Sequence, residues 1–343
     1  MTINSKLGIA LIGAGRIGKI HAENLATRVR GVQLVGVADV NLSAAQLVAE
    51  EWNIPRAVED YRVLLDDENV DAIIIASATD THAAIMEQAA DAGKHIFCEK
   101  PIAHDLDQID RALAAVERAG VKLQIGFNRR FDPNFVKARK LIAEGRIGAP
   151  HILHIISRDP APPPLEYILV SGGIFLDMTI HDFDMARYLI ASEVTEVYAT
   201  GEVRIDPQIG AAGDIDIAVT LLRFENGVIG TIDNSRGTSY GYDQRVEIFG
   251  ATGAISISNE KPDEATISDQ QGIHTTLPHY FFLERYTEAY IQELREFVAV
   301  VRENRAPSVN GQDGRIPVVI GLAAKKSLLE HRPVKVAEIG ANA

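Results

Sequence analysis

The stretch Gly13-Ala14-Gly15-Arg16-Ile17-Gly18 limits the fold of this chain more than any other part of its sequence. It follows the apolar run Leu7 to Ile12 and opens an amphipathic segment from Ile17 to Thr27, so it joins an expected strand to an expected helix. The first glycine would turn the chain, the second would let backbone N–H groups meet a pyrophosphate, and the third would allow close helix–strand packing. This context predicts a dinucleotide site, although a glycine turn in an α/β protein without a nucleotide would have the same pattern.

Short apolar runs alternate with amphipathic segments from residue 7 to about residue 126. Such an alternation predicts parallel strands joined by helices, which is a doubly wound α/β domain of the Rossmann type covering residues 1–126. The expected strands are Leu7 to Ile12, Gln33 to Ala38, Ala72 to Ala76, His95 to Cys98 and Lys122 to Ile125. The expected helices are Ile17 to Thr27, Ser43 to Trp52, Thr81 to Ala92 and Leu106 to Ala119.

An acidic residue, Asp39, follows the second expected strand. Its carboxylate could accept hydrogen bonds from both hydroxyls of an adenine ribose and would repel a 2′-phosphate. Val40 and Asn41 come next, so no adjacent cation would favour a phosphate. The sequence therefore predicts NAD rather than NADP as the cofactor.

Two further segments fall at carboxyl ends of expected strands, where a doubly wound sheet borders its ligand. The first segment runs from Ser77 to His82. His82 either belongs to the cofactor site or caps the next helix together with Asp80 and Thr81. Capping is the favoured interpretation. In the second, Glu99-Lys100-Pro101, Lys100 could stabilise a developing alkoxide, while a surface lysine in a turn is the alternative. The predicted cofactor-site residues are Gly13, Gly15, Arg16, Ile17, Gly18, Asp39, Ser77, Thr79, His82, Glu99 and Lys100.

The pattern changes after residue 126 to longer strands with alternating polarity. Hairpins are expected from Ile215 to Asp233, around the turn Glu225-Asn226-Gly227, and from Arg245 to Ser258. Other expected elements are strands at His151 to Arg158 and Glu196 to Arg204 and helices at Leu283 to Glu303 and Gln312 to Glu330. Residues 127–311 are therefore expected to form an α+β domain with a large, mainly antiparallel open sheet. Residues 312–343 are expected to supply a helix that packs back on the N-terminal domain.

The segment from Asp177 to Asp184 combines two carboxylates with an imidazole. On a single helix, Asp177 and His181 would share one face, and Gly172 and Gly173 just before them would leave room for a bound molecule. An acid–imidazole pair beside such a gap suits proton transfer, although a histidine on a partly apolar helix can equally be structural.

Composition sets broad limits on partners and compartment. A formal charge of −13 over 343 residues, with no basic patch, argues against nucleic acid and anionic membranes. The single cysteine, Cys98, suits a reducing compartment and is expected to be a small buried residue. The first apolar run is too short for a secretion signal, and no stretch is long enough to cross a bilayer, so a cytoplasmic protein is expected. The histidines do not form a dense ligand set, and no metal site is expected.

With these features in order, the chain resembles the glucose–fructose oxidoreductase/inositol dehydrogenase/MocA superfamily over essentially its whole length. The narrower resemblance is to myo-inositol 2-dehydrogenases. It is carried by the segments Ser157 to Pro164, Ser171 to Gly173, Asp177 to Arg187, Asn234 to Arg236 and Tyr240 to Arg245. The proline run and the Tyr-Gly-Tyr-Asp segment discriminate best among these.

The resemblance implies an NAD-dependent oxidation of a secondary alcohol on a cyclic polyol, with myo-inositol going to 2-keto-myo-inositol. It implies Lys100, Asp177 and His181 as the catalytic residues, with His181 as general base. The same residues would contact the substrate, joined by Arg130, Asp184, Tyr240 and Tyr242. It also implies a homotetramer packed through the open sheet. Two alternatives stay open: a dehydrogenase of another inositol isomer or a pyranose sugar, and a non-catalytic NAD-binding regulator.

Overall fold

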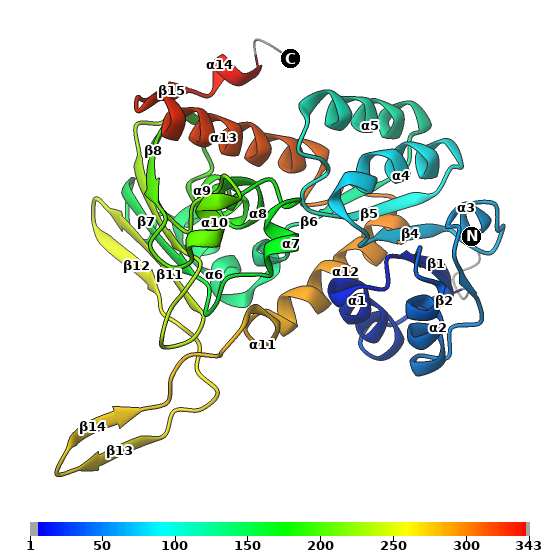
Figure 1. Ribbon diagram of the computed structural model, residues 1–343, viewed down its shortest axis with the longest axis horizontal. Helices are drawn as coiled ribbons and strands as arrows, with labels where there is room; N and C mark the ends of the chain where they lie inside the picture. The colour runs from blue at the N-terminus through cyan, green and yellow to red at the C-terminus, as the bar shows by residue number, and fades with distance from the viewer. Residues whose placement is uncertain (1–5, 341–343) are drawn as a thin grey trace. The chain divides into compact units, whose positions relative to one another are not determined.

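The computed structural model describes residues 6–340, which divide into two compact units (Figure 1). The first unit contains the described residues up to Phe131 together with Glu288–Ile316, and the second contains Asp132–Thr287 and the described residues from Pro317 onward. The sequence analysis assigned residues 288–311 to the second domain. They belong with the first unit because Leu294, Phe297, Val298 and Val301 pack into its core.

The first unit is built on a six-stranded parallel sheet with the order β3-β2-β1-β4-β5-β6. This order is that of a dinucleotide-binding doubly wound fold, as predicted. Its strands are β1 (Leu7–Ile12), β2 (Val32–Ala38), β3 (Ala57–Val58), β4 (Ala72–Ile75), β5 (His95–Glu99) and β6 (Leu123–Gly126). Its helical segments are α1 (Arg16–Thr27), α2 (Leu42–Glu51), α3 (Arg62–Leu65), α4 (Thr79–Asp91), α5 (Leu106–Ala119), the 3₁₀ turn η1 (Asn128–Phe131) and nearly all of α12 (Thr287–Glu303).

Helices cover both faces of this sheet. In Figure 1, α4 and α5 lie on one side of the strands, and α1, α2 and α12 lie on the other. The core on the second side joins Leu25 of α1, Val48 of α2, Phe97 of β5 and Phe297 of α12. Strands β1 and β4, in the middle of the sheet, are buried on both faces, which explains their continuous apolar sequences.

The second unit contains a seven-stranded mixed sheet with the order β12-β11-β7-β10-β9-β8-β15. All neighbouring strands are antiparallel except β7 and β10, so the predicted mainly antiparallel sheet is confirmed. Its strands are β7 (Pro150–Arg158), β8 (Val194–Glu202), β9 (Ile217–Phe224), β10 (Ile229–Ser235), β11 (Asp243–Gly250), β12 (Gly253–Ile257) and β15 (Val334–Lys335). Its helices are α6 (Pro133–Ala143), α7 (Leu165–Ile168), α8 (Ile174–Asp177), α9 (Ile180–Ile190), α10 (Pro207–Ala211), α11 (Phe282–Arg285), α14 (Ala337–Gly340) and the part of α13 (Gly311–Glu330) from Pro317 onward.

The two faces of the seven-stranded sheet differ. One face is covered by α9 and α13, and the amide of Ala199 in β8 donates to the hydroxyl of Ser327 in α13 over 2.9 Å. The other face leaves apolar side chains exposed. They are Ile152, Tyr198, Val219, Leu221, Ile229 and Phe249. The strict alternation of β9 produces this division, because successive side chains of a strand point to opposite faces.

Three strands of the second unit were not predicted, namely the two-residue strand β15 and the two strands of a hairpin. Strands β13 (Thr266–Asp269) and β14 (Gly272–Thr275) form a separate hairpin that extends away from the seven-stranded sheet (Figure 1). Every residue of both strands is exposed. The hairpin has few apolar residues, so the sequence gives no alternating pattern that would reveal it.

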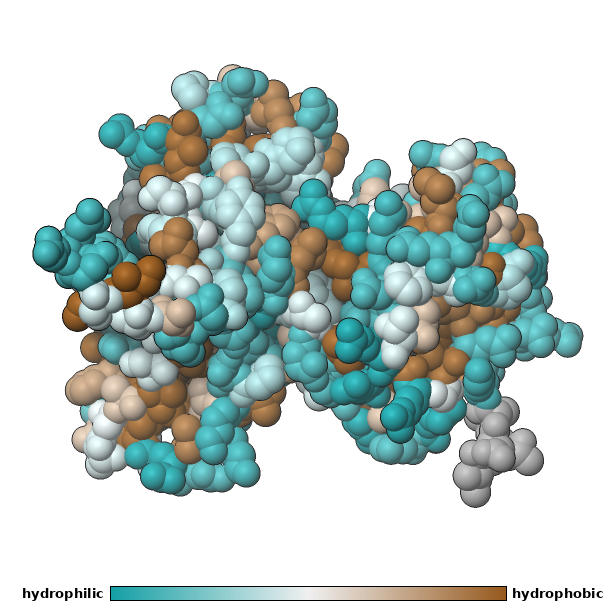
Figure 2. All heavy atoms as spheres, turned by 90° about the horizontal axis from the view of Figure 1, so that it is seen from below, coloured by the Kyte–Doolittle hydropathy of each residue, from teal (hydrophilic) through white to brown (hydrophobic). Residues whose placement is uncertain are grey.

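The surface of the protein mixes polar and apolar side chains. Figure 2 shows hydrophilic and hydrophobic residues intermingled over the face that it presents. Among residues 6–340, no helix combines the length and the apolar character needed to span a bilayer.

Candidate active site and cofactor site

Two glycines of the loop after β1 are fixed by close backbone contacts. Gly13 has a φ of 103°, and a Cβ there would lie 2.4 Å from the carbonyl oxygen of Ala76. A Cβ on Gly18 would lie 1.9 Å from the carbonyl oxygen of Gly13. No larger side chain fits at either position, so the loop can turn tightly only with glycine there.

Gly15 differs, because a Cβ added there would meet nothing within 4 Å. It is the residue before helix α1, and no side chain caps that helix end. The start of a helix presents N–H groups and a partial positive charge, which together favour an anion such as a pyrophosphate. Open space at an uncapped helix end therefore fits a dinucleotide at this loop.

Asp39 faces the same loop from the end of β2. Its Oδ2 accepts a hydrogen bond from the amide of Ala14 over 2.7 Å, and its Oδ1 accepts from the amide of Asn41 over 2.8 Å. Val40, directly after it, is 89% exposed. The structure thus brings the acidic residue to the glycine loop, where it would meet the adenosine ribose of the cofactor.

This position leads to a prediction about cofactor choice. Replacing Asp39 by serine and the exposed Val40 by arginine is expected to raise the NADP-to-NAD ratio of kcat/KM. The change removes charge-assisted hydrogen bonds worth about 1.5–3 kcal/mol each and supplies a cation for the 2′-phosphate, so an increase of at least about tenfold is expected. Initial-rate kinetics with both cofactors measure it, and Asp60→Ser, on an exposed turn of the same unit, serves as the control. An unchanged ratio would refute the role given to Asp39.

His82 does not cap helix α4, contrary to the favoured interpretation of the sequence. The helix begins at Thr79 without a side-chain cap. Each nitrogen of the buried His82 ring instead lies near a carbonyl oxygen, Nδ1 at 2.9 Å from that of Pro101 and Nε2 at 3.0 Å from that of Ser77, and a neutral ring can donate to one of the two. Burial lowers the pKa of His82 below its ordinary value, so the ring is neutral at neutral pH. His82 therefore holds the segment after Lys100 in place.

Lys100 follows the buried end of β5 and is itself half-buried. The peptide bond between Lys100 and Pro101 is cis. Just before it, the carboxylate of Glu99 bonds His21 Nε2 at 2.7 Å. Cys98 is fully buried, and burial raises the pKa of its thiol well above the ordinary value, which fits a packing role rather than a nucleophile.

Asp177 and His181 do not lie on one continuous helix, which corrects the expectation from their spacing. Asp177 ends α8, and His181 lies in the first turn of α9. Within Ile174 to Arg187, these two residues alone are not buried. Asp177 and His181 are therefore the two side chains of this segment that are not buried in the core. They are four residues apart, but the helix is interrupted between them.

Two residues that the sequence analysis did not select hold Asp177. The hydroxyl of Tyr167 donates to Asp177 Oδ1 over 2.8 Å, and Arg236 Nη1 donates to Oδ2 over 3.0 Å. Arg236 is 1% exposed and also contacts Asp214 at 3.5 Å. Both contacts donate to the carboxyl oxygens, so the Asp177 side chain is held in a fixed orientation.

The start of α9 is held by a buried polar chain. Thr179 Oγ1 donates to Asn234 Oδ1 over 2.9 Å, and Asn234 Nδ2 donates to Asp182 Oδ2 over 2.8 Å. These contacts tie α9 to β10 and fix the turn that carries His181. Asp184 is almost fully buried on the same helix.

The remaining predicted substrate contacts have other partners in the structure. Arg130 Nη2 forms an ion pair with Asp313 Oδ1 at 3.0 Å, within the first unit. Tyr242 is buried, and its ring meets Tyr286 edge-on with the ring centres 6.0 Å apart.

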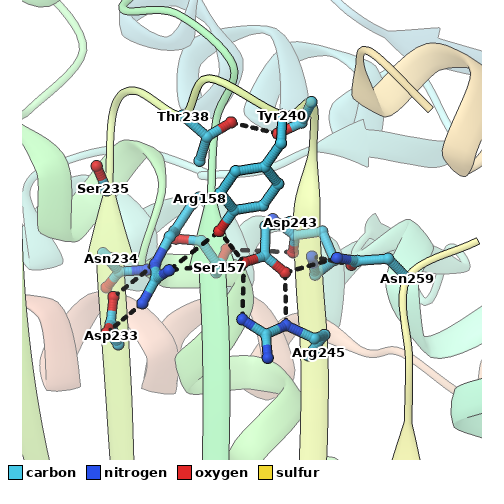
Figure 3. A network of polar contacts seen from close by, with 12 residues as sticks. Ser157, Arg158, Asp233, Asn234, Ser235, Thr238, Tyr240, Asp243, Arg245 and Asn259 are labelled. Carbon is cyan, nitrogen blue, oxygen red and sulfur yellow. Dashed lines mark hydrogen bonds and ion pairs between the residues drawn. The ribbon is translucent and has the colours of Figure 1, made fainter. Parts of the chain in front are cut away.

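The hydroxyl of Tyr240 belongs to a polar network at the ends of β7, β10 and β11 (Figure 3). It donates to Asp243 Oδ2 over 2.6 Å and accepts from Arg158 Nη1 over 3.1 Å. Arg158 in turn binds Asp233 through two hydrogen bonds. Burial of Asp243 raises its pKa, but hydrogen bonds from Arg245, Tyr240 and Asn259 outweigh it and leave the pKa below its ordinary value. Tyr240 is therefore held in place by charged neighbours.

One group of potential metal ligands occurs among residues 6–340. His21, Glu99 and Glu293 each offer one ligand atom, and these atoms lie within 4.8 Å of one another. All three belong to the first unit.

The glycine loop, the uncapped helix and Asp39 define the first unit as an NAD-binding domain, and comparison with known proteins gives the family. Residues 7–127 match the family described as "Oxidoreductase family, NAD-binding Rossmann fold", and residues 135–256 match the GFO/IDH/MocA C-terminal domain. The chain belongs to this GFO/IDH/MocA oxidoreductase family, and it is an NAD-dependent oxidoreductase.

Several relatives are similar along nearly the whole chain. The myo-inositol 2-dehydrogenase of Thermotoga maritima is 49% identical over 96% of this chain and 99% of its own length. The inositol 2-dehydrogenase of Rhizobium meliloti is 43% identical over 95% of this chain and 98% of its own length. The scyllo-inositol dehydrogenase of Lactobacillus casei, solved with NAD(H) and scyllo-inositol, has 30% identity and a TM-score of 0.91, with 97% and 100% of the two chains covered.

Proposed function

We propose that this protein oxidises the axial secondary alcohol of myo-inositol to 2-keto-myo-inositol and reduces NAD. One structural observation carries the proposal: an anchored carboxylate, Asp177, and an imidazole, His181, are the two accessible residues in an otherwise buried segment. The similarity to proteins named myo-inositol 2-dehydrogenase supports the substrate class.

Each proposed residue has a distinct role in the reaction. Bound NAD supplies the hydride acceptor for the C–H bond of the alcohol. His181 takes the hydroxyl proton as general base, so that a C=O bond forms as the hydride leaves. Lys100 binds the reacting oxygen and stabilises the negative charge that develops on it. Asp177, held by Tyr167 and Arg236, orients His181 or a neighbouring substrate hydroxyl.

A panel of substrates tests the proposal. NADH production is measured with myo-, scyllo- and chiro-inositol and with aldopyranoses at matched concentrations. The highest kcat/KM is expected with myo-inositol. Because a Bacillus subtilis relative at 39% identity is named scyllo-inositol 2-dehydrogenase (NAD(+)), another isomer is the first alternative. Preference for a pyranose would reject the inositol assignment, and no NADH with any polyol would indicate an NAD-binding regulator.

We further propose that the protein is a cytoplasmic homotetramer that packs through the exposed face of the seven-stranded sheet. Six large apolar side chains on one face of a sheet mark an interaction surface.

Replacing Leu221 on this face with lysine is expected to shift the assembly toward smaller species, because the charge would be buried in the interface. Sedimentation velocity measures the change. Leu329→Lys is the control, since Leu329 is exposed on α13. An unchanged sedimentation coefficient for Leu221→Lys would place the interface elsewhere.

A further inference from the structure

Helix α8, which carries the proposed catalytic residue Asp177, is too short to fix its own position. It contains four residues, from Ile174 to Asp177, and a single helical turn is unstable unless other parts of the fold hold it. The three residues before it form neither helix nor strand. The position of Asp177 is therefore set by contacts from outside the helix.

The carboxylate of Asp214 holds the start of α8. Its Oδ1 accepts a hydrogen bond from the amide of Ile174 over 3.1 Å. Gly173, just before, has a φ of 86°, and a Cβ there would lie 2.9 Å from the same oxygen, so a side chain at this position would displace the carboxylate. This contact corrects the expectation that Gly173 leaves room for a bound molecule, because Asp214 takes the space beside it.

The guanidinium of Arg236 holds the other end of α8. Its Nη1 donates to Asp177 Oδ2 over 3.0 Å, and its Nη2 forms an ion pair with Asp214 Oδ2 at 3.5 Å. Arg236 therefore joins the last residue of α8 to the side chain that binds the first amide of the helix. We call Arg236 and Asp214 together the α8 anchor.

The loop that carries Asp214 is itself fixed. Asp216, two residues further on, is fully buried, and its carboxylate accepts hydrogen bonds from the three amides of residues 204–206 over 2.7 to 2.9 Å. The main-chain oxygen of Asp216 also accepts from the amide of Arg236 over 2.9 Å. The two residues of the α8 anchor are thus linked through the main chain as well as through their side chains.

Arg236 is a charged side chain in an almost fully enclosed place. It is 1% exposed, and its Nε has no hydrogen-bond partner among residues 6–340. Burial would lower its pKa, but the charges of Asp177, Asp214 and Asp159 outweigh burial and hold the pKa above its ordinary value. Buried ion pairs are a poor source of stability, because the desolvation of both charges offsets their attraction. The orientation that Arg236 gives to Asp177 explains this arginine better than stability does.

We propose that Arg236 and Asp214 are positioning residues, which set the place of the Asp177 carboxylate by holding both ends of α8. Each acts through Asp177 and not through a contact with the polyol or the nicotinamide. Their effect on catalysis rests on the role proposed for Asp177, whereas their effect on the place of α8 does not.

Three substitutions in the α8 anchor test this proposal. Arg236→Met removes the charge and keeps much of the volume, Arg236→Lys keeps the charge, and Asp214→Ala removes the carboxylate. Arg236→Met and Asp214→Ala are each expected to lower kcat by about 10- to 100-fold through misplacement of Asp177. Arg236→Lys is expected to lose less than Arg236→Met. NADH affinity is expected to stay near that of the wild type, because the glycine loop belongs to the first unit.

Asp263→Ala is the matched control for Asp214→Ala. Asp263 is an exposed residue of the same unit, and its carboxylate likewise accepts a main-chain amide, that of Ala265, over 2.9 Å. This variant is expected to keep the wild-type kcat.

Single-turnover kinetics separate misplacement of Asp177 from loss of fold. Enzyme in excess over NAD is mixed with saturating myo-inositol, and NADH formation is followed by stopped-flow absorbance. A misplaced carboxylate lowers the rate constant of this phase, whereas a fraction of unfolded protein lowers its amplitude. Arg236→Met and Asp214→Ala are expected to lower the rate constant.

Amide hydrogen exchange tests the place of α8 without any substrate. Exchange of the peptide containing Gly173 to Met178 is expected to accelerate in Arg236→Met and Asp214→Ala and to stay at the wild-type rate in Asp263→Ala. Wild-type exchange in both anchor variants would overturn the proposal.

Two kinetic results would also overturn it. One is a single-turnover rate constant in Arg236→Met and Asp214→Ala equal to that of Asp263→Ala, and the other is a reduced amplitude with an unchanged rate constant. If Arg236→Met does not fold, Arg236→Lys and Asp214→Ala decide the outcome. If the wild type reduces no NAD with any polyol, the proposed function fails, while hydrogen exchange still decides whether the anchor holds α8.

Discussion

Replacing His181 with asparagine is expected to lower kcat for polyol oxidation by about 10²–10⁴-fold, the usual contribution of a positioned general base. Asparagine is similar in size and polar, but it cannot accept the hydroxyl proton. Because His181 lies in the second unit and the NAD-binding loop in the first, NADH affinity is expected to stay near that of the wild type.

His154→Asn is the matched control for this loss. His154 lies on β7 of the same unit, is exposed, and bonds Thr231 at 2.6 Å. Steady-state kinetics and NADH fluorescence titration are measured on both variants. A His181→Asn enzyme that keeps half of the wild-type kcat would remove His181 from the mechanism.

Replacing Arg285 with methionine is expected to lower the free energy of unfolding of the second unit by about 3–5 kcal/mol, the cost of breaking a buried ion pair. Arg285 and its partner Asp132 have side-chain exposures of 2% and 3%. Asp132 also caps α6 by accepting from the amides of Asn134 and Phe135. The substitution leaves that carboxylate buried without its cation.

Arg305→Met provides the comparison for this prediction. Arg305 pairs with Glu296, and their side chains are 38% and 20% exposed, so its loss is expected to cost about 0–1 kcal/mol. Urea unfolding monitored by circular dichroism measures both variants. Equal decreases in the free energy of unfolding for Arg285→Met and Arg305→Met would contradict the importance given to burial of the ion pair between Arg285 and Asp132.

The fold of the first unit follows from local sequence signals. Strands β1 and β4 are buried on both faces and read as continuous apolar runs, and Gly13 and Gly18 are required by close contacts with the carbonyl oxygens of Ala76 and Gly13. The place of α12 could not be predicted in the same way. Its apolar face shows that it packs on a core, but an amphipathic pattern does not say which core.

The candidate site was predictable in its residue types and less so in its geometry. The spacing of Asp177 and His181 indicated one helix, but Thr179 bonds Asn234, a residue 55 positions away, and long-range contacts of this kind override local preference. Tyr167, Arg236 and Asp214 were missed for a related reason. Nothing in their local sequence shows that the fold brings them to Asp177 or to the amide of Ile174.

Transfer of deuterium from myo-inositol labelled at C2 tests the central claim most directly. The wild-type protein is incubated with NAD and the labelled polyol, and both products are examined by mass spectrometry. Direct hydride transfer predicts deuterium in the reduced nicotinamide and an unlabelled 2-keto-myo-inositol. Deuterium that stays in the polyol product, or reduced cofactor without the label, would contradict the account.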